Sequence, residues 1–497
     1  MTTVHEPTAG VRRLSLRKNF SWALAGNFLY ALCQLGILFV IQATGSLELV
    51  GSYSLALALC VPIFLLTNLQ LRTLQTTDSQ RKFHFSDYAG VRAAMTPLAL
   101  LILIVIATCG HYSRETALVI IAMGLSKAIE TASELCYGAF QQHERLDYVS
   151  WSLCWKGITA LTIIGGTVAL TGNLVLALCL VSVAWLFVFL LYDFRNVYRL
   201  FEHDQTAATA TSRSNLRTVW SELRPRWRGA AVWKIVLCGL PLGVGGLLLS
   251  ATDSFPNIFV EWKFGARDLG VFALLLTVSF AGLPVVNALG QAVTPRLAQN
   301  YANGNVRGFQ QVLFKAVLLG CLFGLALIVG TYFVGEWVLA LCFGADVAAH
   351  SDLLLMLMCL APLKYGFRFF GNGLTATRRF SWVLRFQLVG LALLVGLAPL
   401  FAIWWGMMGV AVAILLATFI RSSLFAWQIQ HELETIAANP VDVNFVRQMS
   451  LAARALWADF QQVLQTLRAR LNPPATSDST DPFRANPELT PASTVKR

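Results

Sequence analysis

The sequence predicts an all-α membrane protein that crosses the bilayer about twelve times. Of its 497 residues, 56% are hydrophobic and 13% are charged, and the mean hydropathy is +0.61. About a quarter of the residues of a soluble protein are charged, so this composition excludes that class. The apolar residues form repeated runs of about 20 residues, the length at which a helix crosses the hydrocarbon core. The formal charge of +12 falls mostly in alternate loops, which indicates membrane orientation and not a nucleic-acid surface.

Two sets of six spans are predicted, with a polar stretch between them. The spans cover residues 20–43, 50–71, 89–109, 116–138, 151–171 and 174–194, then 232–259, 268–292, 310–333, 353–376, 383–404 and 407–428. The expected domains are an N-terminal six-helix lobe over 1–194, a cytoplasmic connector over 195–230, a C-terminal six-helix lobe over 231–428 and a cytoplasmic tail over 429–497. The first apolar run is too long for the core of a signal peptide, so it is interpreted as a span.

Basic residues fix the expected orientation. One set of loops and span ends is rich in Lys and Arg, comprising Arg12, Arg13, Arg17, Lys18, Arg72, Arg81, Lys82, Arg92, Arg145, the connector, Arg296, Arg307, Arg378 and Arg379. The other set carries Arg114, Lys263 and Arg267. Since cytoplasmic loops carry the excess of Lys and Arg, both termini are expected on the cytoplasmic side.

Two amphipathic segments are expected on the membrane surface. In the connector, a short apolar stripe lies among arginines and consists of Leu216, Val219, Trp220 and Leu223. After the last span, residues 440–471 repeat apolar side chains at helical spacing with charges between them, which predicts a second surface helix. From Asn472 onward, the Pro, Ser, Thr and Asp content predicts a disordered tail.

The segment 117–145 is an apolar helix with ionisable residues at its centre. At about 100° per residue, Lys127 and Glu134 lie within about 20° of each other, and Glu130 lies about 60° to one side. Because ionisable groups that face lipid cost several kcal/mol, these side chains are expected to face other helices or a water-filled cavity. The sequence therefore predicts a bundle that encloses a polar space.

The two halves share a weak repeat that keeps the same order. Gly45–Leu49 precedes the second span as Gly265–Leu269 precedes the eighth, and Pro62 and Pro284 fall inside these spans. Their ends carry Arg and Gln at matching spacing, as Arg72 and Gln75 in one half and Arg296 and Gln299 in the other. A duplicated six-helix unit is common in transporters, which bind substrate where the repeats meet.

Five segments together resemble one known family. They are residues 17–40, 49–78, 85–92, 127–147 and 288–305. These segments, such as KAIETASELCYGAFQQHERLD at 127–147, are similar to the lipopolysaccharide and O-antigen flippases of the polysaccharide transport family. Its superfamily also holds multidrug/toxin extruders (MATE) and lipid II flippases. The resemblance covers most of residues 15–430 and implies a MATE-like fold, with two six-helix lobes around a central cavity.

The resemblance also implies a function. A member of this family would move an undecaprenyl-pyrophosphate-linked oligosaccharide from the cytoplasmic to the periplasmic leaflet of the bacterial inner membrane. The expected partners are that lipid-linked substrate, membrane lipids, a polysaccharide polymerase and a chain-length regulator, with no nucleic acid, cofactor or metal. The family pattern leads us to expect a basic residue in the seventh span, where this chain has Asn257.

Candidate substrate-binding residues lie in three spans. In the first, Tyr30 and Gln34 share a face with Asn27 beside them; they could line a sugar site or only connect helices, as Asn and Gln often do in membranes. In the tenth, Lys364 and Arg368 lie one turn apart and suit a pyrophosphate.

Lys364 and Arg368 could equally neutralise the carboxylates of the fourth span. We expect Lys127, Glu130 and Glu134 to face them across the lobe interface, so that Glu130 and Glu134 compete with substrate for the two cations. Glu130, Glu134 and Asp253 are the candidates for ion coupling. For Asp253, the alternative is a hydrogen bond to the backbone freed by Pro256.

Two other functions fit parts of the pattern. A cation-coupled drug exporter would share the fold, but the first span lacks the carboxylate that proton-coupled exporters use there. A membrane polymerase or ligase would need larger outer loops than the stretch near Gly335–Asp352. The ten cysteines show neither a CxxC pair nor metal-ligand spacing and are interpreted as small buried apolar residues. The sequence therefore favours a transporter over an enzyme.

Overall fold

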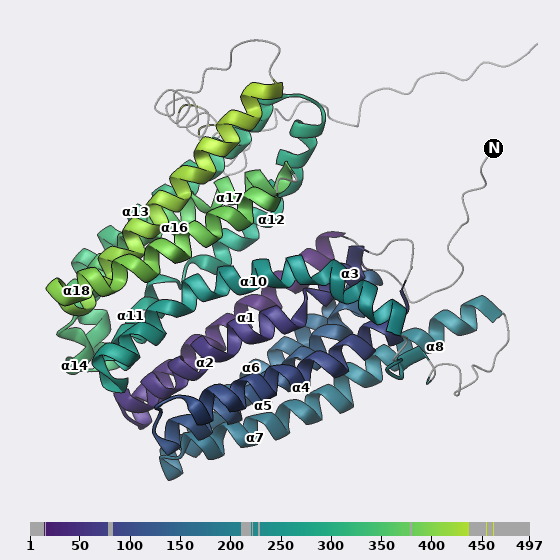
Figure 1. Cartoon of the computed structure of the whole chain (residues 1–497), viewed down its shortest axis with the longest axis horizontal. Coiled ribbons are helices and arrows are strands. Elements are labelled where there is room, and N and C mark those ends of the chain that lie inside the picture. The colour runs from purple at the N-terminus through teal and green to yellow at the C-terminus, as the bar shows by residue number, and fades with distance from the viewer. Residues whose placement is uncertain are drawn as a thin grey trace, which may run out of the picture.

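The computed structural model describes residues 14, 16–77, 83–209, 220, 222–226, 229–377, 380–436, 454 and 461. Every regular element in these ranges is a helix, which confirms the predicted all-α class (Figure 1). The first half contains α1 (Leu16–Thr44), α2 (Leu47–Asn68), α3 (Leu71–Thr77), α4 (Phe85–Cys109), α5 (Arg114–Gln142), α6 (Leu146–Thr171), α7 (Leu174–Val188), the π-helix η1 (Phe189–Phe194) and α8 (Arg195–Thr209). The second half contains α10 (Gly229–Phe264), α11 (Ala266–Ser279), α12 (Leu283–Ala302), α13 (Val306–Phe343), α14 (Ala345–Ala348), α15 (Ser351–Met358), α16 (Leu360–Gly366), α17 (Arg368–Ala376) and α18 (Phe380–Ile436).

Within the described ranges, ten helices are long and apolar enough to cross a membrane. The longest, Ser381–Glu434, has 54 residues, and at about 1.5 Å per residue it far exceeds the hydrocarbon core of about 30 Å. It bends at Gly406, where φ is 57° and ψ is −136°, a conformation that glycine adopts readily. This helix therefore supplies the last two predicted spans, and the chain is a multi-pass membrane protein.

The eighth predicted span is divided into α11 and α12 by a break at Phe280–Gly282. The fully buried Tyr365 bridges the break, because its hydroxyl donates to the Ser279 carbonyl (2.7 Å) and accepts from the Gly282 amide (3.2 Å). Pro284 lies in the first turn of α12, where its missing N–H leaves no helical hydrogen bond unmade. The predicted single span is thus two helices, and Phe280 and Leu283 at their junction border the candidate site described below.

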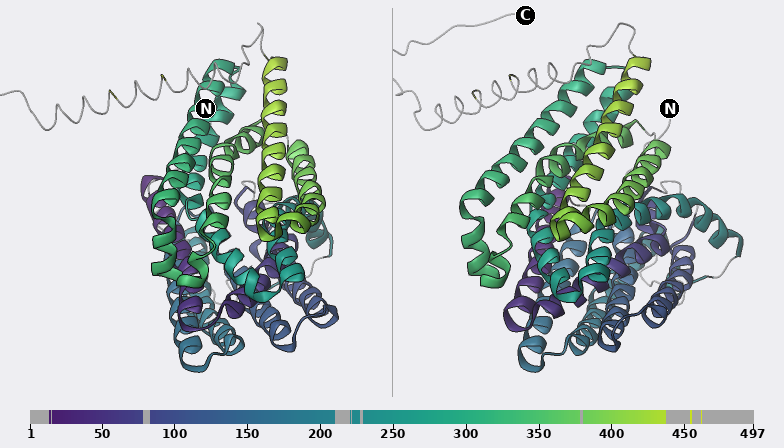
Figure 2. Two further views of the ribbon diagram at one scale, coloured as in Figure 1. Left: turned by 90° about the vertical axis from the view of Figure 1, so that its left-hand side faces the viewer. Right: turned by 60° about the vertical axis from the view of Figure 1, so that its left-hand side comes forward.

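The helices form two lobes, with α10 between them (Figures 1 and 2). We call the half that contains the turns near residues 45, 111, 172, 265, 345 and 406 the outer half, and the opposite half the inner half. One continuous apolar core in the outer half contains residues of both lobes. In the inner half the described residues form three further cores: one of α12–α18, one within the N-terminal lobe, and one in which Ile235 of α10 packs on the N-terminal lobe. The helices after α11 are therefore packed against the N-terminal lobe at the outer half, whereas α10 also contacts that lobe in the inner half.

A symmetric crossing of α2 and α11 joins the lobes at the outer half. A Cβ placed on Gly51 would overlap the Ala266 carbonyl, and one placed on Gly270 would overlap the Leu47 carbonyl. Leu47 begins α2 and Ala266 begins α11, so each helix presents the same position to the other. This is the relation that a duplicated unit requires. The structure aligns Leu47 with Ala266, which differs by one residue from the alignment that matches Gly45 with Gly265.

The described part of the connector packs on the N-terminal lobe. Leu223 is buried against residues of α5 and α6, and the Arg226 amide donates to the Ser86 carbonyl at 3.0 Å. Leu223 was expected to face lipid, and this is corrected because it completes an apolar cluster of the protein. Leu216, Val219 and nearly all of the predicted tail lie outside the described residues.

Candidate functional site: two polar networks

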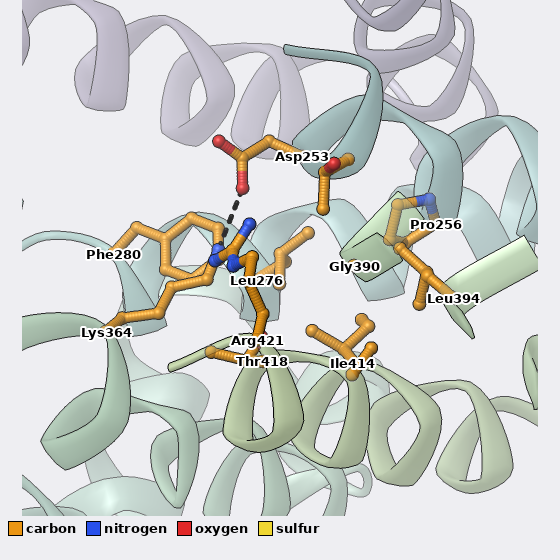
Figure 3. Close-up of a pocket in the computed structure, with 12 residues that line it drawn as sticks. Asp253, Pro256, Leu276, Phe280, Lys364, Gly390, Leu394, Ile414, Thr418 and Arg421 are labelled. Carbon is orange, nitrogen blue, oxygen red and sulfur yellow. Dashed lines mark hydrogen bonds and ion pairs between the residues drawn. The ribbon is translucent and has the colours of Figure 1, made fainter. Parts of the chain in front are cut away.

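The C-terminal lobe contains an ion pair between α10 and α16. The Lys364 ammonium donates to Asp253 Oδ1 at 3.0 Å and lies 3.6 Å from the centroid of the Phe280 ring (Figure 3). The Lys364 side chain is 12% exposed, whereas that of Asp253 is 52% exposed. The carboxylate is therefore the accessible member, and the ammonium is confined by the carboxylate and the aromatic ring. The expected backbone role of Asp253 after Pro256 is not the contact seen.

Arg421 of α18 completes this group, and the sequence reasoning missed it. Its Nη1 donates to Gln387 Oε1 at 2.9 Å, while its buried Nε has no partner among the described residues. Figure 3 shows its guanidinium beside the Lys364 ammonium, on the same side of Asp253. The signal was present in the sequence, because Arg421 interrupts the apolar run 407–428 and an intramembrane cation is a functional candidate.

Two hollows meet at these residues. The smaller, about 10 Å³, has Asp253, Lys364 and Arg421 in its wall, and space of that size holds about one water. The larger has a volume of about 220 Å³ and is also lined by Arg368. Its other walls come from Leu249, Leu283, Leu363, Phe367, Gly371, Asn372, Thr375, Val383, Gln387, Thr418, Ser422 and Phe425. Every lining residue belongs to α10 or a later helix, so this cavity lies within the C-terminal lobe and not between the repeats.

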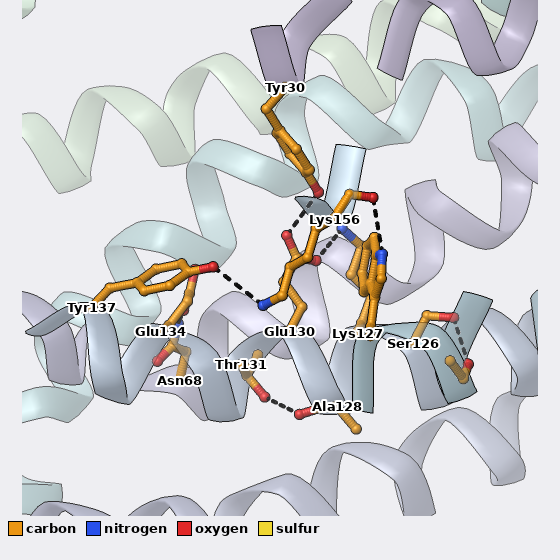
Figure 4. A network of polar contacts seen from close by, with 12 residues as sticks. Tyr30, Asn68, Ser126, Lys127, Ala128, Glu130, Thr131, Glu134, Tyr137 and Lys156 are labelled. Carbon is orange, nitrogen blue, oxygen red and sulfur yellow. Dashed lines mark hydrogen bonds and ion pairs between the residues drawn. The ribbon is translucent and has the colours of Figure 1, made fainter. Parts of the chain in front are cut away.

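In the N-terminal lobe, the predicted residues of α5 form a compensated network (Figure 4). Lys127 pairs with Glu130 at 2.7 Å, one helical turn away, and the Tyr30 hydroxyl of α1 donates to the same carboxylate at 3.0 Å. Glu134 accepts from the Asn68 amide, whose own oxygen accepts from Arg92. Arg92 was counted as a loop cation, but it is buried within the lobe.

A second buried pair in this lobe was also missed. Lys156 of α6 lies 3.6 Å from Asp193 of η1, and their side chains are 1% and 0% exposed. Lys156 also donates to the Tyr137 hydroxyl at 3.2 Å. Both residues are charged and lie inside predicted spans. The rule that identified Lys127 and Glu130, that an ionisable residue within a span is a candidate for function, would also have identified this pair. The π-helical turn that places Asp193 could not have been predicted from the apolar pattern.

The remaining candidates of the first span differ in their exposure and in their hydrogen bonds. Asn27 is exposed and donates to its own helix, at the Ala23 carbonyl (2.7 Å). Gln34 is half-buried and makes no hydrogen bond among the described residues. Gly26 has no room for a side chain because Ser150 of α6 packs against it. Of this face, Tyr30 alone contacts a predicted ionisable residue.

The structure does not form the expected contacts between the lobes. Lys364 pairs with Asp253 of its own lobe, and Lys127 pairs with Glu130 of its own helix. In the described part of the N-terminal lobe, Lys127, Lys156 and Arg92, with Arg72 at 5.6 Å from the Tyr137 ring centroid, lie near the three carboxylates Glu130, Glu134 and Asp193. Around the large cavity, one carboxylate, Asp253, faces three cations, Lys364, Arg368 and Arg421. The larger excess of positive charge among these described residues therefore surrounds the cavity of the C-terminal lobe.

The fold is one that MATE transporters share, and comparisons with known proteins support this. Residues 241–400 match the MatE family model. The chain is similar in structure to an inward-facing multidrug resistance MATE family transporter of the MOP superfamily, with a TM-score of 0.58, 13% identity and coverage of 85% of this chain and 96% of that one. An outward-facing transporter of the same description gives a TM-score of 0.57, 14% identity and coverage of 84% and 95%. The chain thus has the two-lobe MATE fold, which confirms the predicted architecture.

A curated relative adds a biological context. The chain is 24% identical over 404 residues to the capsular polysaccharide biosynthesis protein CapF of Staphylococcus aureus, with coverage of 81% of this chain and 96% of that protein. The matched family and the solved structures are transporters, in agreement with the prediction of a transporter and not an enzyme.

Proposed function

We propose that the protein is a flippase that moves an undecaprenyl-pyrophosphate-linked oligosaccharide across the bacterial inner membrane. The observation that carries the proposal is the 220 Å³ cavity, in which three cations face one carboxylate among the described residues. A diphosphate needs several charge-assisted hydrogen bonds, and arginine provides them in pairs. The unpaired Nε of Arg421 supplies a free donor at this position.

The same charge balance argues against a cationic drug as the main substrate. A drug cation would enter a cavity whose described ionisable residues sum to a positive charge, and repulsion in a partly dehydrated space is strong. The solved neighbours include multidrug transporters, so this alternative has the same fold. The polysaccharide name of the curated relative supports the anionic, lipid-linked substrate.

The packing of the lobes fits one end of a transport cycle, in which the outer half is closed. The shared apolar core occupies the outer half, which the positive-inside rule predicts to be the periplasmic side. A cavity in the C-terminal lobe would then receive the headgroup from the cytoplasmic leaflet. Release to the other leaflet would require the outer core to separate, as alternating access demands.

A reconstituted flipping assay tests the proposal. We expect Arg421→Ala to reduce translocation of an undecaprenyl-pyrophosphate-linked oligosaccharide at least about tenfold, because a charged hydrogen bond contributes roughly 1.5–3 kcal/mol. The matched control is Arg385→Ala, on the same helix, because Arg385 is exposed and stacks on Trp382 at 4.8 Å. Unchanged translocation by Arg421→Ala, or transport of cationic dyes at a rate that matches the lipid-linked substrate, would overturn it.

A further inference from the structure

We propose that Asp253 is an internal competitor for the anion site: its carboxylate holds the cavity cations when the site is empty and exchanges with the substrate diphosphate when the site fills. This inference rests on the proposed function, because it concerns the same cavity. It replaces the inter-lobe competition expected from Glu130 and Glu134 with one inside a single lobe.

The contacts of Lys364 make the exchange possible. Lys364 lines both hollows, so its ammonium can leave Asp253 for a ligand in the larger one without crossing a barrier of protein. The ammonium also lies 3.6 Å from the centroid of the Phe280 ring, on the wall of the smaller hollow, so Phe280 and Asp253 together hold it when the site is empty. The Asp253 side chain is 52% exposed, so after exchange the carboxylate is left in the cavity, where water can solvate it.

The charges give a reason for the competitor. Three cations with no counterion would be costly to hold within a membrane, and they would bind a diphosphate so tightly that release would limit transport. One carboxylate at hydrogen-bond distance lowers both the cost of holding the cations and their affinity for a diphosphate. A transported ligand must bind well enough to enter and weakly enough to leave, a condition that ion pathways also meet.

The test uses the full-length protein in lipid nanodiscs, with inorganic pyrophosphate as the probe. We expect Asp253→Asn to tighten pyrophosphate binding about tenfold, because it removes one opposing charge at contact distance. In the flipping assay the same variant should be slower than the unchanged protein, since release becomes limiting. Asp253→Glu keeps the negative charge. Its affinity for pyrophosphate should therefore stay within about twofold of that of the unchanged protein.

A second pair of variants covers the case in which Asp253→Asn leaves Lys364 buried without a partner and fails to fold. Lys364→Gln removes the ion pair but keeps Asp253 facing Arg368 and Arg421, whereas Lys364→Gln with Asp253→Asn leaves a neutral pair that folding tolerates. We expect the double variant to bind pyrophosphate more tightly than Lys364→Gln alone. Equal or weaker binding by the double variant overturns the inference.

The two proposals fail in different ways. If pyrophosphate binding depends on Arg421 but does not tighten when Asp253 loses its charge, the competitor is refuted and the flippase proposal stands. If binding is absent, or unaffected by Arg421→Ala, the anion site itself is wrong. Tighter binding with faster flipping would also refute the competitor, because release would not be limiting.

Discussion

Single charged residues distinguish the largely compensated network of the N-terminal lobe from the positive cavity of the C-terminal lobe. In the N-terminal lobe each described intramembrane cation has a carboxylate nearby, as with Lys127 and Glu130 at 2.7 Å. In the C-terminal lobe, Asp253 is the one carboxylate among the described residues that line the large cavity, and it pairs with Lys364. Buried pairs cost much when one member is removed and little when both are, so the two lobes should respond differently to substitution.

Arg368 belongs to the positive group and lines the cavity from the first turn of α17. Replacing it with Ala should abolish flipping at normal expression, and Arg368→Lys should restore part of the activity, because lysine keeps the charge but not the bidentate geometry. The measurement is glycan export at matched protein levels. The matched control is Leu388→Ala, because Leu388 is 55% exposed, whereas a leucine such as Leu357 is fully buried and its loss would perturb packing.

Near-normal export by Lys364→Ala/Arg368→Ala would mean that these two cations have a structural role. In that case the diphosphate site would have to lie elsewhere in the protein.

Lys156 and Asp193 should behave as a structural pair. We expect Lys156→Met or Asp193→Asn alone to destabilise the protein by roughly 3–5 kcal/mol, since each leaves an uncompensated buried charge. Lys156→Met combined with Asp193→Asn should recover most of the loss. Thermal unfolding of the purified variants measures this, and a double variant less stable than both single ones would contradict it.

At the scale of elements, α2 and α11 form the close backbone contact between the lobes at the outer half. Their close approach depends on Gly51 and Gly270, each of which faces the first residue of the other helix. Side chains there would force the backbones apart, because the neighbouring atoms are carbonyls and not flexible side chains.

Gly51→Ala should therefore weaken closure of the outer half and lower transport severalfold. Gly166→Ala is the control, since Gly166 lies in α6 with open space around its Cβ position. Introduced cysteine pairs across the α2–α11 crossing report closure as the yield of disulfide. A yield equal to that of the unchanged glycine background would show that the helices do not need this contact.

At the scale of the whole molecule, the inner-half core of α12–α18 is separate from the cores that contain the N-terminal lobe and α10, which indicates that the cavity is reached from that side. Thr375 lines the larger hollow and is exposed. We expect Thr375→Cys to react with an impermeant maleimide in inside-out vesicles and to be protected in right-side-out cells. The native Cys109, exposed at the outer end of α4, should show the opposite pattern. Labelling of both from one side would contradict the orientation.

The sequence alone determined the membrane class, the helical spans and the identity of several buried charges. It could do so because apolar length and the cost of intramembrane charge are local properties, readable at Lys127, Glu130 and Lys364 without knowing their neighbours. Only the tertiary structure decided which charges meet. Asp253 and Lys364 are 111 residues apart in the chain, and their contact depends on how α10 packs against α16. The break at Phe280–Gly282 likewise depends on Tyr365 from a distant helix, and such long-range packing leaves no period in the sequence.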